Sequence, residues 1–305
     1  MVLGKRRKKN KKNKQKQSIL SEAAIVVSNA LSEDIGAGDI TSQGLIDPQT
    51  KVKAWIIVKE KNIVVCGMDI LKEVFYQVDR KIKIKSYVRD GDFLKTKTKI
   101  CEIQGAARSI LTAERTALNF LGRFSGISTK TYLLVKKIKK YKIKILDTRK
   151  TTPGLRILEK YAVKIGGGIN HRMGLYDCVL IKDNHLKLLR QQKKEDIFKS
   201  AINRFKKKFK GRIKIEVEVK NQKELKNALK CNPDVIMLDN MSLTQMRQAV
   251  KMRDLLNSQV RLEASGNINE ANIEQAAASG VDFISVGALT HSVKSIDFSL
   301  NFIDF

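Results

Sequence analysis

Polar residues follow the ends of six short apolar segments in the second half of the chain. These segments are IKIL (143–146), CVLI (178–181), IKIEVEV (213–219), DVIML (234–238), VRLEA (260–264) and DFISV (282–286). The polar residues and glycines at or near their carboxyl ends are Asp147, Thr148, Arg149, Lys150, Lys182, Asp183, Asn184, Glu216, Glu218, Asp239, Asn240, Ser265, Gly266 and Gly287. Arg and Lys suit anionic ligands, and polar residues at successive strand ends are how an α/β barrel builds its active site. The sequence therefore predicts an enzyme with a site at the mouth of a barrel.

The spacing of the apolar segments predicts how this site is held. Helical stretches such as KELKNALK, LTQMRQAVKMRDLL and NEANIEQAAASG separate the last four segments, which start 21, 26 and 22 residues apart. Such spacing is typical of βαβ units, which form a parallel sheet with right-handed crossovers.

The first half of the chain has a different pattern. A helix is expected from Ser18 to Leu31, with an apolar stripe that includes Ala23 and Val27. Residues 52–104 alternate as strands do, with a helix-like interruption from Met68 to Val78. This part is expected to form a small mixed α/β domain, and a helical segment from Ser109 to about Lys140 follows it.

The composition is that of a soluble protein. Of 305 residues, 42% are hydrophobic, which suffices for a sizeable core. No apolar run approaches the roughly 20 residues of a membrane span, and no secretory signal pattern follows the basic start. The four cysteines (Cys66, Cys101, Cys178 and Cys231) are far apart and form no metal-binding motif. They are expected to be buried thiols in a reducing compartment, the cytoplasm.

The formal net charge of +29 raises the alternative of a basic RNA-binding module. Residues 1–17 hold nine Lys or Arg and no acid, and much of the remaining charge lies in stretches such as KKIKKYKIK, where Lys alternates with Ile. Such alternation is typical of a solvated face over an apolar one. No zinc finger, helix-turn-helix or RNP-type motif accompanies the charge, so a dedicated nucleic-acid function is the weaker hypothesis.

Several motifs together resemble a known family. The segments are ERTALNFLGRFSGIST (114–129), DTRKTTPGLR (147–156) and KIGGGINHRMGLYDCVLIKDNH (164–185), with EDIGAGDITS, IEVEV, IMLDN, EASGNI and SVGALTHS around them. In this order, from about residue 18 to residue 302, they are similar to the quinolinate phosphoribosyltransferases. The combination of DTRKTTPGLR with GGG-x-x-HR is the most specific part of the resemblance.

The resemblance implies a fold and a reaction. The fold is an N-terminal open α/β sandwich domain followed by a partly open parallel α/β barrel, in a homodimer that shares its active sites, with a higher oligomer left open. The reaction joins quinolinate to phosphoribosyl pyrophosphate, with Mg²⁺ as cofactor, and gives nicotinate mononucleotide, pyrophosphate and carbon dioxide in NAD biosynthesis. A related enzyme that acts on nicotinate remains an alternative, since only the dicarboxylate yields carbon dioxide.

The resemblance also assigns residues to the two substrates. Quinolinate is a dianion, and the residues implied around it are Arg115 from the partner subunit and Thr148, Arg149, His171, Arg172 and Lys182. Lys150 and His291 are implied for the phosphates of phosphoribosyl pyrophosphate, and Ser265, Gly266 and Gly287 for its 5′-phosphate. Glu218 and Asp239 are implied for the ribose and the accompanying magnesium, with no side chain assigned as a direct metal ligand. Lys150, Glu218 and Asp239 are the expected catalytic residues.

Several of these residues also have purely structural interpretations. Glu216 and Glu218 point to one face of a strand, which could be a solvent face, and Gly166–Gly168 could simply end a helix. His171 by itself could be a structural histidine, and His185 is expected to be one. Whether Glu216 and Glu263 join the site is left open.

Two segments depart from the family pattern. Asn267 stands where a second glycine is expected after Gly266, and Gly122 and Phe124 interrupt a helical segment that usually carries larger or aliphatic residues.

The sequence also predicts the domain limits. A disordered basic tail is expected over 1–17 and an N-terminal domain over 18–116. Residues 290–305 are expected to return to that domain, and the barrel domain to cover 117–289. A strand or extended segment is expected from Ile296 to Phe302.

Overall fold

The structure, a computed structural model, describes residues 2–191 and 196–303, with side-chain surroundings from Ile19 onward. It divides into two compact units. Unit 1 comprises Met1–Tyr132, Thr151–Gly167 and Val293–Phe305, and unit 2 comprises Leu133–Lys150 and Gly168–Ser292. The limit expected at residue 116 therefore falls inside one helix, α4 (Ala107–Lys137). A continuous helical pattern contains no turn signal that could mark where one compact unit ends.

Unit 1 contains a four-stranded antiparallel sheet in the order β12-β1-β5-β3. Its strands are β1 (Lys51–Val58), β3 (Lys83–Ser86), β5 (Thr98–Ala106) and β12 (Phe298–Phe302). Buried and more exposed residues alternate along β1, as expected for a strand with one face on a core. The predicted return of the C-terminus is confirmed, because β12 pairs with β1 in the register Ile56 to Leu300. Strands β2 (Ile63–Val64) and β4 (Phe93–Leu94) form a separate short pair.

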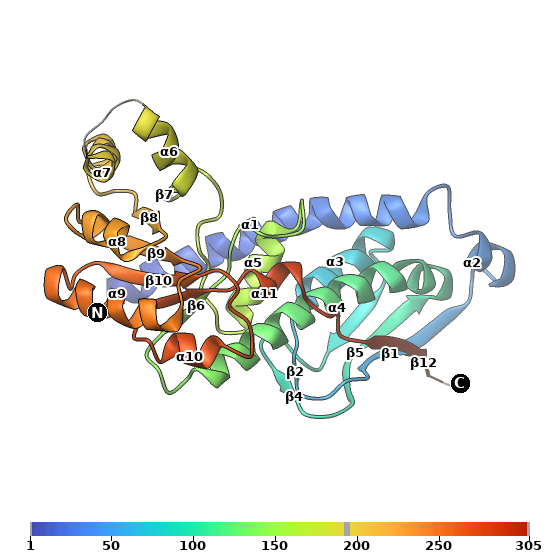
Figure 1. Ribbon diagram of the computed structural model, residues 1–305. Helices are drawn as coiled ribbons and strands as arrows, with labels where there is room; N and C mark the ends of the chain where they lie inside the picture. Colours follow the sequence, from blue (N-terminus) through green and yellow to red (C-terminus); the bar gives the residue numbers. More distant parts are fainter. Residues whose placement is uncertain (1, 192–195, 304–305) are drawn as a thin grey trace. The chain divides into compact units, whose positions relative to one another are not determined.

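Five helices belong mainly to unit 1, and Figure 1 shows them with their labels. They are α1 (Val2–Ile35), α2 (Ile40–Leu45), α3 (Met68–Val78), α4 and α5 (Arg156–Ile165). Residues 2–17, expected to be disordered, form the first part of α1. Their nine positive charges and low complexity suggested disorder, but Lys, Arg and Gln are good helix formers, and the segment continues directly into a helix that buries Ala23 and Val27.

Unit 2 contains a six-stranded sheet in which every pairing is parallel. Its order is β6-β11-β10-β9-β8-β7. The strands are β6 (Lys144–Leu146), β7 (Val179–Ile181), β8 (Ile215–Val219), β9 (Val235–Asp239), β10 (Arg261–Ser265) and β11 (Phe283–Ser285). Strands β6 and β7 are the two ends of this order, so in the described part of the chain the sheet does not close. The predicted partly open parallel barrel is confirmed.

Helices connect most of these strands, as the βαβ spacing predicts. They are α6 (Asp183–Gln191), α7 (Ile197–Phe209), α8 (Gln222–Leu229), α9 (Leu243–Leu256) and α10 (Ile273–Ala277), and the short α11 (Ala288–His291) follows the last strand, β11. Because the strands are parallel, their carboxyl ends meet at one edge of the sheet, where the predicted site residues lie.

Two further predictions concern the chain as a whole. All four cysteines are free, and Cys66, Cys101 and Cys231 are buried. Across the described residues, no helix combines the length and apolarity that crossing a membrane requires.

Candidate active site

A cavity of about 740 Å³ lies at the carboxyl ends of the strands of unit 2. Every strand of the six-stranded sheet contributes residues to it, either from its last positions or from the loop that follows. The predicted site residues that line it are Thr148, Arg149, Lys150, His171, Arg172, Lys182, Glu218, Asp239, Ser265, Gly266, Gly287 and His291. The structure thus brings together all the predicted residues except Arg115.

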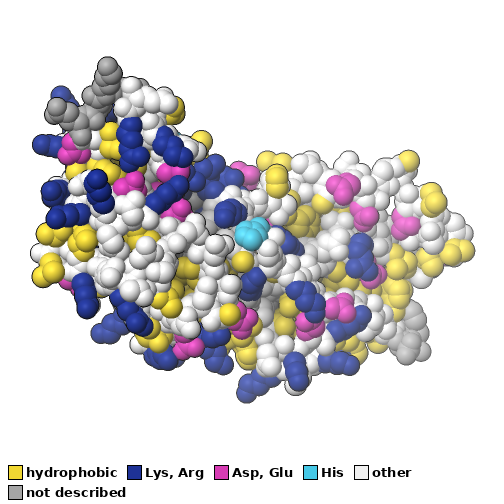
Figure 2. Space-filling view, viewed as in Figure 1, with side chains coloured by type: hydrophobic (Ala, Val, Ile, Leu, Met, Phe, Trp, Pro, Cys, Tyr) yellow, Lys and Arg dark blue, Asp and Glu magenta, His cyan; other side chains and the backbone are white. Residues whose placement is uncertain are grey.

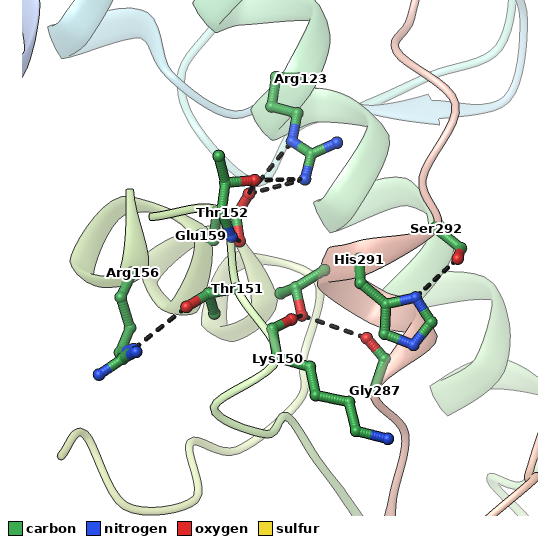
Figure 3. A network of polar contacts seen from close by, with 10 residues as sticks. Arg123, Lys150, Thr151, Thr152, Arg156, Glu159, Gly287, His291 and Ser292 are labelled. Carbon is green, nitrogen blue, oxygen red and sulfur yellow. Dashed lines mark hydrogen bonds and ion pairs between the residues drawn. The ribbon is translucent and has the colours of Figure 1, made fainter. Parts of the chain in front are cut away.

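Lys150 and His291 both lie against Gly287. A Cβ atom at Gly287 would approach Lys150 Cδ to 3.1 Å and His291 Nε2 to 3.2 Å, so a larger residue would displace these side chains. The hydroxyl of buried Thr290 donates to the carbonyl of Lys150 at 2.7 Å, which fixes the backbone from which the Lys150 side chain extends. Figure 3 shows the Lys150 side chain, Gly287 and the His291 ring next to one another.

His171 and Arg172 reach the cavity along the free edge of β6. Ile169 forms a parallel bridge with Leu146, and the His171 N–H donates to the carboxylate of buried Asp147 at 2.9 Å. The Arg172 guanidinium donates to the Cys178 carbonyl at 3.3 Å. Burial, and then the positive charge of Arg149, lower the pKa of Arg172. The cations of this cavity therefore repel one another, and an anionic ligand would relieve that repulsion.

Two carboxylates lie at neighbouring strand ends, Glu218 on β8 and Asp239 on β9. Burial and then the charge of Asp239 raise the pKa of Glu218, while Lys182 opposes the shift. Acidic oxygens beside one another suit a ligand that offers several hydroxyl groups, or a cation carried by that ligand.

The turn after β10 explains the asparagine that departs from the family pattern. Gly266 has φ +92° and Asn267 has φ +51°, a region that favours glycine but that asparagine tolerates better than most residues. The Asn267 side-chain amide donates to the side-chain oxygen of Asn240 at 3.1 Å, and the Asn240 N–H donates to the Ser265 carbonyl at 2.9 Å. A Cβ at Gly266 would run into the Asn240 side chain. Asn267 therefore preserves the turn.

A buried cluster of His171, Glu216 and Glu263 adjoins the cavity. His171 and Glu263 line the cavity, and we call this cluster its floor. His171 Nε2 lies 2.8 Å from Glu216 Oε2 and 3.7 Å from Glu263 Oε2. His171 Nδ1 accepts the Arg172 backbone N–H at 2.8 Å, so both ring nitrogens are engaged within the protein. Glu263 lines the cavity, and burial followed by the charge of Glu216 raises its pKa well above the ordinary value. The acids left open from the sequence are thus both buried at the site.

His185 and Arg115 lie outside this cavity. His185 Nδ1 accepts the Lys182 backbone N–H at 3.0 Å, as a structural histidine would. Arg115 lines a separate cavity of about 510 Å³ within unit 1, beside Arg123 and the 295–298 segment. Its expected contact with a partner's site stays a prediction.

Other residues line the cavity that the site prediction did not include. They are Glu263, which was left open, and Leu180, Met237, Asn240, Asn267, Ile268, Asn269, Ser285 and Ala288. Asn240 and Ser285 were within reach of sequence reasoning, since they immediately follow or end an apolar strand. Ile268 and Asn269 belong to the loop after β10, whose course no periodicity reveals.

Positive charge is not confined to the cavity. Figure 2 shows Lys and Arg side chains over most of the visible face, among acidic and apolar ones.

Known proteins with similar sequences and structures identify the family of this chain. Residues 39–125 match the family described as quinolinate phosphoribosyl transferase, N-terminal domain, and residues 127–301 match the corresponding C-terminal domain. The chain is 44% identical over 286 residues to a probable nicotinate-nucleotide pyrophosphorylase (carboxylating) of Methanocaldococcus jannaschii, covering 92% of this chain and 97% of that one. It is 38% identical over 291 residues to quinolinate phosphoribosyltransferase (decarboxylating) 1b of Nicotiana tabacum, covering 90% and 81%.

A solved structure extends the likeness to the fold. The nicotinate-nucleotide pyrophosphorylase of Francisella tularensis superposes with a TM-score of 0.85 at 42% identity, over 93% of this chain and 97% of that one. Both family domains, the full-length relatives and the strand-end cavity thus point the same way, and this chain belongs to the quinolinate phosphoribosyltransferase family.

Proposed function

We propose that the cavity of unit 2 is where this chain carries out the reaction of its family. That reaction transfers the phosphoribosyl group of phosphoribosyl pyrophosphate to the ring nitrogen of quinolinate, with decarboxylation, and yields nicotinate mononucleotide for NAD biosynthesis. The observation that carries the proposal is the gathering of four cationic side chains and two carboxylates from successive strand ends into one cavity: Arg149, Lys150, Arg172, Lys182, Glu218 and Asp239.

Arg149, Arg172 and Lys182 are the proposed quinolinate contacts. A guanidinium presents a planar fork of donors that matches a carboxylate, and two adjacent carboxylates call for more than one such group. The lowered pKa of Arg172 supports this assignment, because it reflects cations packed together beside a space for an anion. Thr148 and His171 complete this side. With both ring nitrogens engaged, His171 would act by holding the Arg172 backbone in place.

Lys150 and His291 are proposed to bind the phosphates of the second substrate. Their shared contact with Gly287 places both on the same part of the cavity wall. Ser265, Gly266 and Gly287 offer backbone groups to the 5′-phosphate, which can approach a glycine closely. Glu218 and Asp239 would accept hydrogen bonds from the ribose hydroxyls.

Magnesium fits this donor set as a companion of phosphoribosyl pyrophosphate. The carboxylates of Glu218 and Asp239 lie at neighbouring strand ends, and a cation on the substrate would offset the repulsion that helps to raise the pKa of Glu218, which supports this proposal. The ion is proposed to arrive on the substrate's own oxygens, where it would neutralise charge on the leaving pyrophosphate.

These contacts support a mechanism based on positioning and electrostatics. The ring nitrogen attacks the anomeric carbon while the bond to pyrophosphate breaks, and Lys150 and His291 stabilise the departing charge. Glu218 and Asp239 hold the ribose as positive charge develops on it. The resulting pyridinium ring withdraws electrons, so the adjacent carboxylate leaves as carbon dioxide and the carbanion then takes up a proton. No side chain need act as a nucleophile.

We also propose a homodimer in which Arg115 completes the partner's cavity. Ile40 and Leu45 of α2 are 84% and 78% exposed, which suits a surface that a second chain covers. Mixing Arg115→Ala with Lys150→Ala protein should restore part of the activity through heterodimers that contain one intact site. Failure to recover activity after confirmed subunit exchange would place the whole site in one chain.

One experiment tests the proposed reaction. The protein is incubated with quinolinate, phosphoribosyl pyrophosphate and magnesium, and nicotinate mononucleotide and carbon dioxide are measured. Equal amounts of both products are expected. Replacing quinolinate by nicotinate distinguishes the related activity, because nicotinate could form the nucleotide only without carbon dioxide.

A further inference from the structure

The cluster of His171, Glu216 and Glu263 contains more acid than its surroundings neutralise. One oxygen of each carboxylate and a ring nitrogen of His171 lie within 4.8 Å of one another. Glu216 is 3% exposed and Glu263 is 1% exposed. Two ionised carboxylates so close together and so well buried would repel strongly and would lose their hydration.

The ring nitrogens of His171 show how many hydrogens this residue offers the two acids. Its Nδ1 accepts the backbone N–H of Arg172, so the imidazole proton belongs on Nε2. Nε2 faces Glu216 at 2.8 Å and donates its single hydrogen there, while Glu263 lies further away at 3.7 Å. The ring of His171 thus offers the hydrogen on Nε2 to two acids.

One oxygen of each carboxylate indicates that this cluster needs a further hydrogen atom. Among the described residues, neither Glu216 Oε1 nor Glu263 Oε1 accepts a hydrogen bond in the structure, although both are buried. Burial and the charge of Glu216 raise the pKa of Glu263 and outweigh the Ser285 hydroxyl beside it, which lowers the pKa of that carboxyl. A proton on one carboxyl would turn an acceptor without a donor into a donor for the other acid. The raised pKa of Glu263, caused first by burial and then by the charge of Glu216, agrees with a proton held on this pair.

We propose that Glu216 and Glu263 share one proton, and that this proton sets the affinity of the cavity for a dianionic ligand. With it, the floor formed by Glu216, Glu263 and His171 carries a single negative charge. Without it, the floor carries two, next to a cavity whose cations hold the ligand and close enough for the charge of Glu216 to act on Arg172. The proposal rests on the proposed function only in taking quinolinate as that dianion.

The proposal has a definite pH dependence. The folded chain keeps this proton above the pH at which an ordinary glutamate loses it, so the floor gains its second charge only as the pH rises further. Quinolinate affinity should then fall by up to about tenfold per pH unit, and binding should take up as much as one proton. The other titratable and charged groups around the floor come from each neighbouring element: Asp147, Arg149, Lys150, Arg172, Cys178, Lys182, Glu218, Asp239 and His291.

Titration calorimetry with quinolinate alone, in the presence of EDTA, tests this from pH 6 to pH 9. Two buffers of different ionisation enthalpy report the protons taken up. Glu263→Gln keeps the shape and supplies an N–H to Glu216, so its floor has a fixed single charge. Its affinity should not follow the pH dependence of the wild type, and its linked proton uptake should vanish.

Two further variants and a control complete the comparison of floor charge with quinolinate affinity. Glu216→Gln leaves Glu263 as the single charge and should flatten the pH dependence in the same way. The double variant has an uncharged floor and should bind quinolinate about tenfold or more tightly than either single variant. Glu270→Gln, which removes one exposed acid of the same unit outside the cavity, should retain the wild-type pH dependence.

Three results would overturn the proposal. One is a Glu263→Gln protein, folded by its thermal transition, that keeps the wild-type pH dependence and proton uptake. Another is a wild type whose affinity does not change between pH 6 and pH 9. The third is stoichiometric binding of Zn²⁺ or Mn²⁺ to EDTA-treated protein that is lost in both single variants, since the cluster would then be a metal site. Product formation is assayed separately, so failure of the proposed reaction remains distinguishable.

Discussion

At the scale of single residues, the cavity depends on charges that do not neutralise one another without a ligand. Arg172 is half-buried and its pKa is lowered by burial and by Arg149, while the pKa of Glu218 is raised by burial and by Asp239. A pair of unit charges at 4 Å interacts by about 4 kcal/mol at an effective dielectric of 20. An anion that binds beside Arg172 therefore relieves the repulsion between cations, and a positive charge that binds beside Glu218 relieves the repulsion between carboxylates.

Arg172 tests the quinolinate side. Arg172→Lys keeps the charge but removes the planar donor fork, so quinolinate binding should weaken by about 1–3 kcal/mol. Binding of phosphoribosyl pyrophosphate should change little. Titration calorimetry with each substrate measures both, and intact quinolinate affinity in this variant would show that Arg172 does not hold a carboxylate.

Glu218 tests the ribose side. Glu218→Gln removes a charge that matters chiefly when the ribose becomes cationic, so kcat should fall by about tenfold or more while both substrates bind nearly as before. Steady-state rates beside calorimetric titrations separate the two effects. A variant that loses binding but not turnover would contradict the assigned role.

At the scale of elements, buried polar contacts join the helices of unit 1. Arg123 on α4 donates to the Glu159 carboxylate of α5 at 2.7 Å, and the Thr152 hydroxyl donates to the same carboxylate at 2.8 Å (Figure 3). Glu159 is fully buried. The structure also explains why a glycine stands at position 122 of α4. A Cβ atom there would approach the Ile296 carbonyl oxygen to 2.7 Å, so a larger residue would not fit.

The Arg123–Glu159 pair gives a stability prediction. Arg123→Leu leaves a buried carboxylate without its cation and should lower the free energy of unfolding by about 3–5 kcal/mol. Arg123→Leu combined with Glu159→Leu removes the orphaned charge and should cost less than Arg123→Leu alone. Urea unfolding of the three proteins measures this, and a double variant less stable than the single one would mean that packing dominates the effect.

At the scale of the whole molecule, the net charge of +29 is the most unusual property. Residues 1–17 carry nine of the basic side chains and lie outside both matched family domains. Attraction to polyanions at low salt is expected from charge alone and falls steeply as salt is added.

Removal of residues 1–17 tests whether this charge serves the reaction. A protein that begins at Ser18 should turn over at the full-length rate in moderate salt, because no predicted site residue lies in the deleted segment. Its affinity for a polyanion such as heparin should fall, with a shallower dependence on salt. Loss of most activity on truncation, at a salt concentration where both proteins stay folded, would assign the segment a catalytic role.

The sequence by itself determined the parallel sheet and most of the site. Apolar segments at βαβ spacing end in Lys150, Lys182, Glu218 and Asp239, and parallel strands bring such ends to one edge whatever the details of packing. The motifs that resemble the family added His171 and Arg172, which lie in a loop without periodicity.

Only the tertiary structure decided how the buried acids and the long helix are used. Glu216 and Glu263 lie 47 positions apart in the sequence, and burial with a shared histidine makes them one acidic pair. The helical pattern of α4 did not reveal where unit 1 ends and unit 2 begins. The helix continues through this boundary, which is defined only by the contacts within each unit. The periodicity of the sequence predicts which side of a strand or helix a side chain lies on. Whether two carboxylates that are distant in the sequence come together depends on how the strands that carry them assemble.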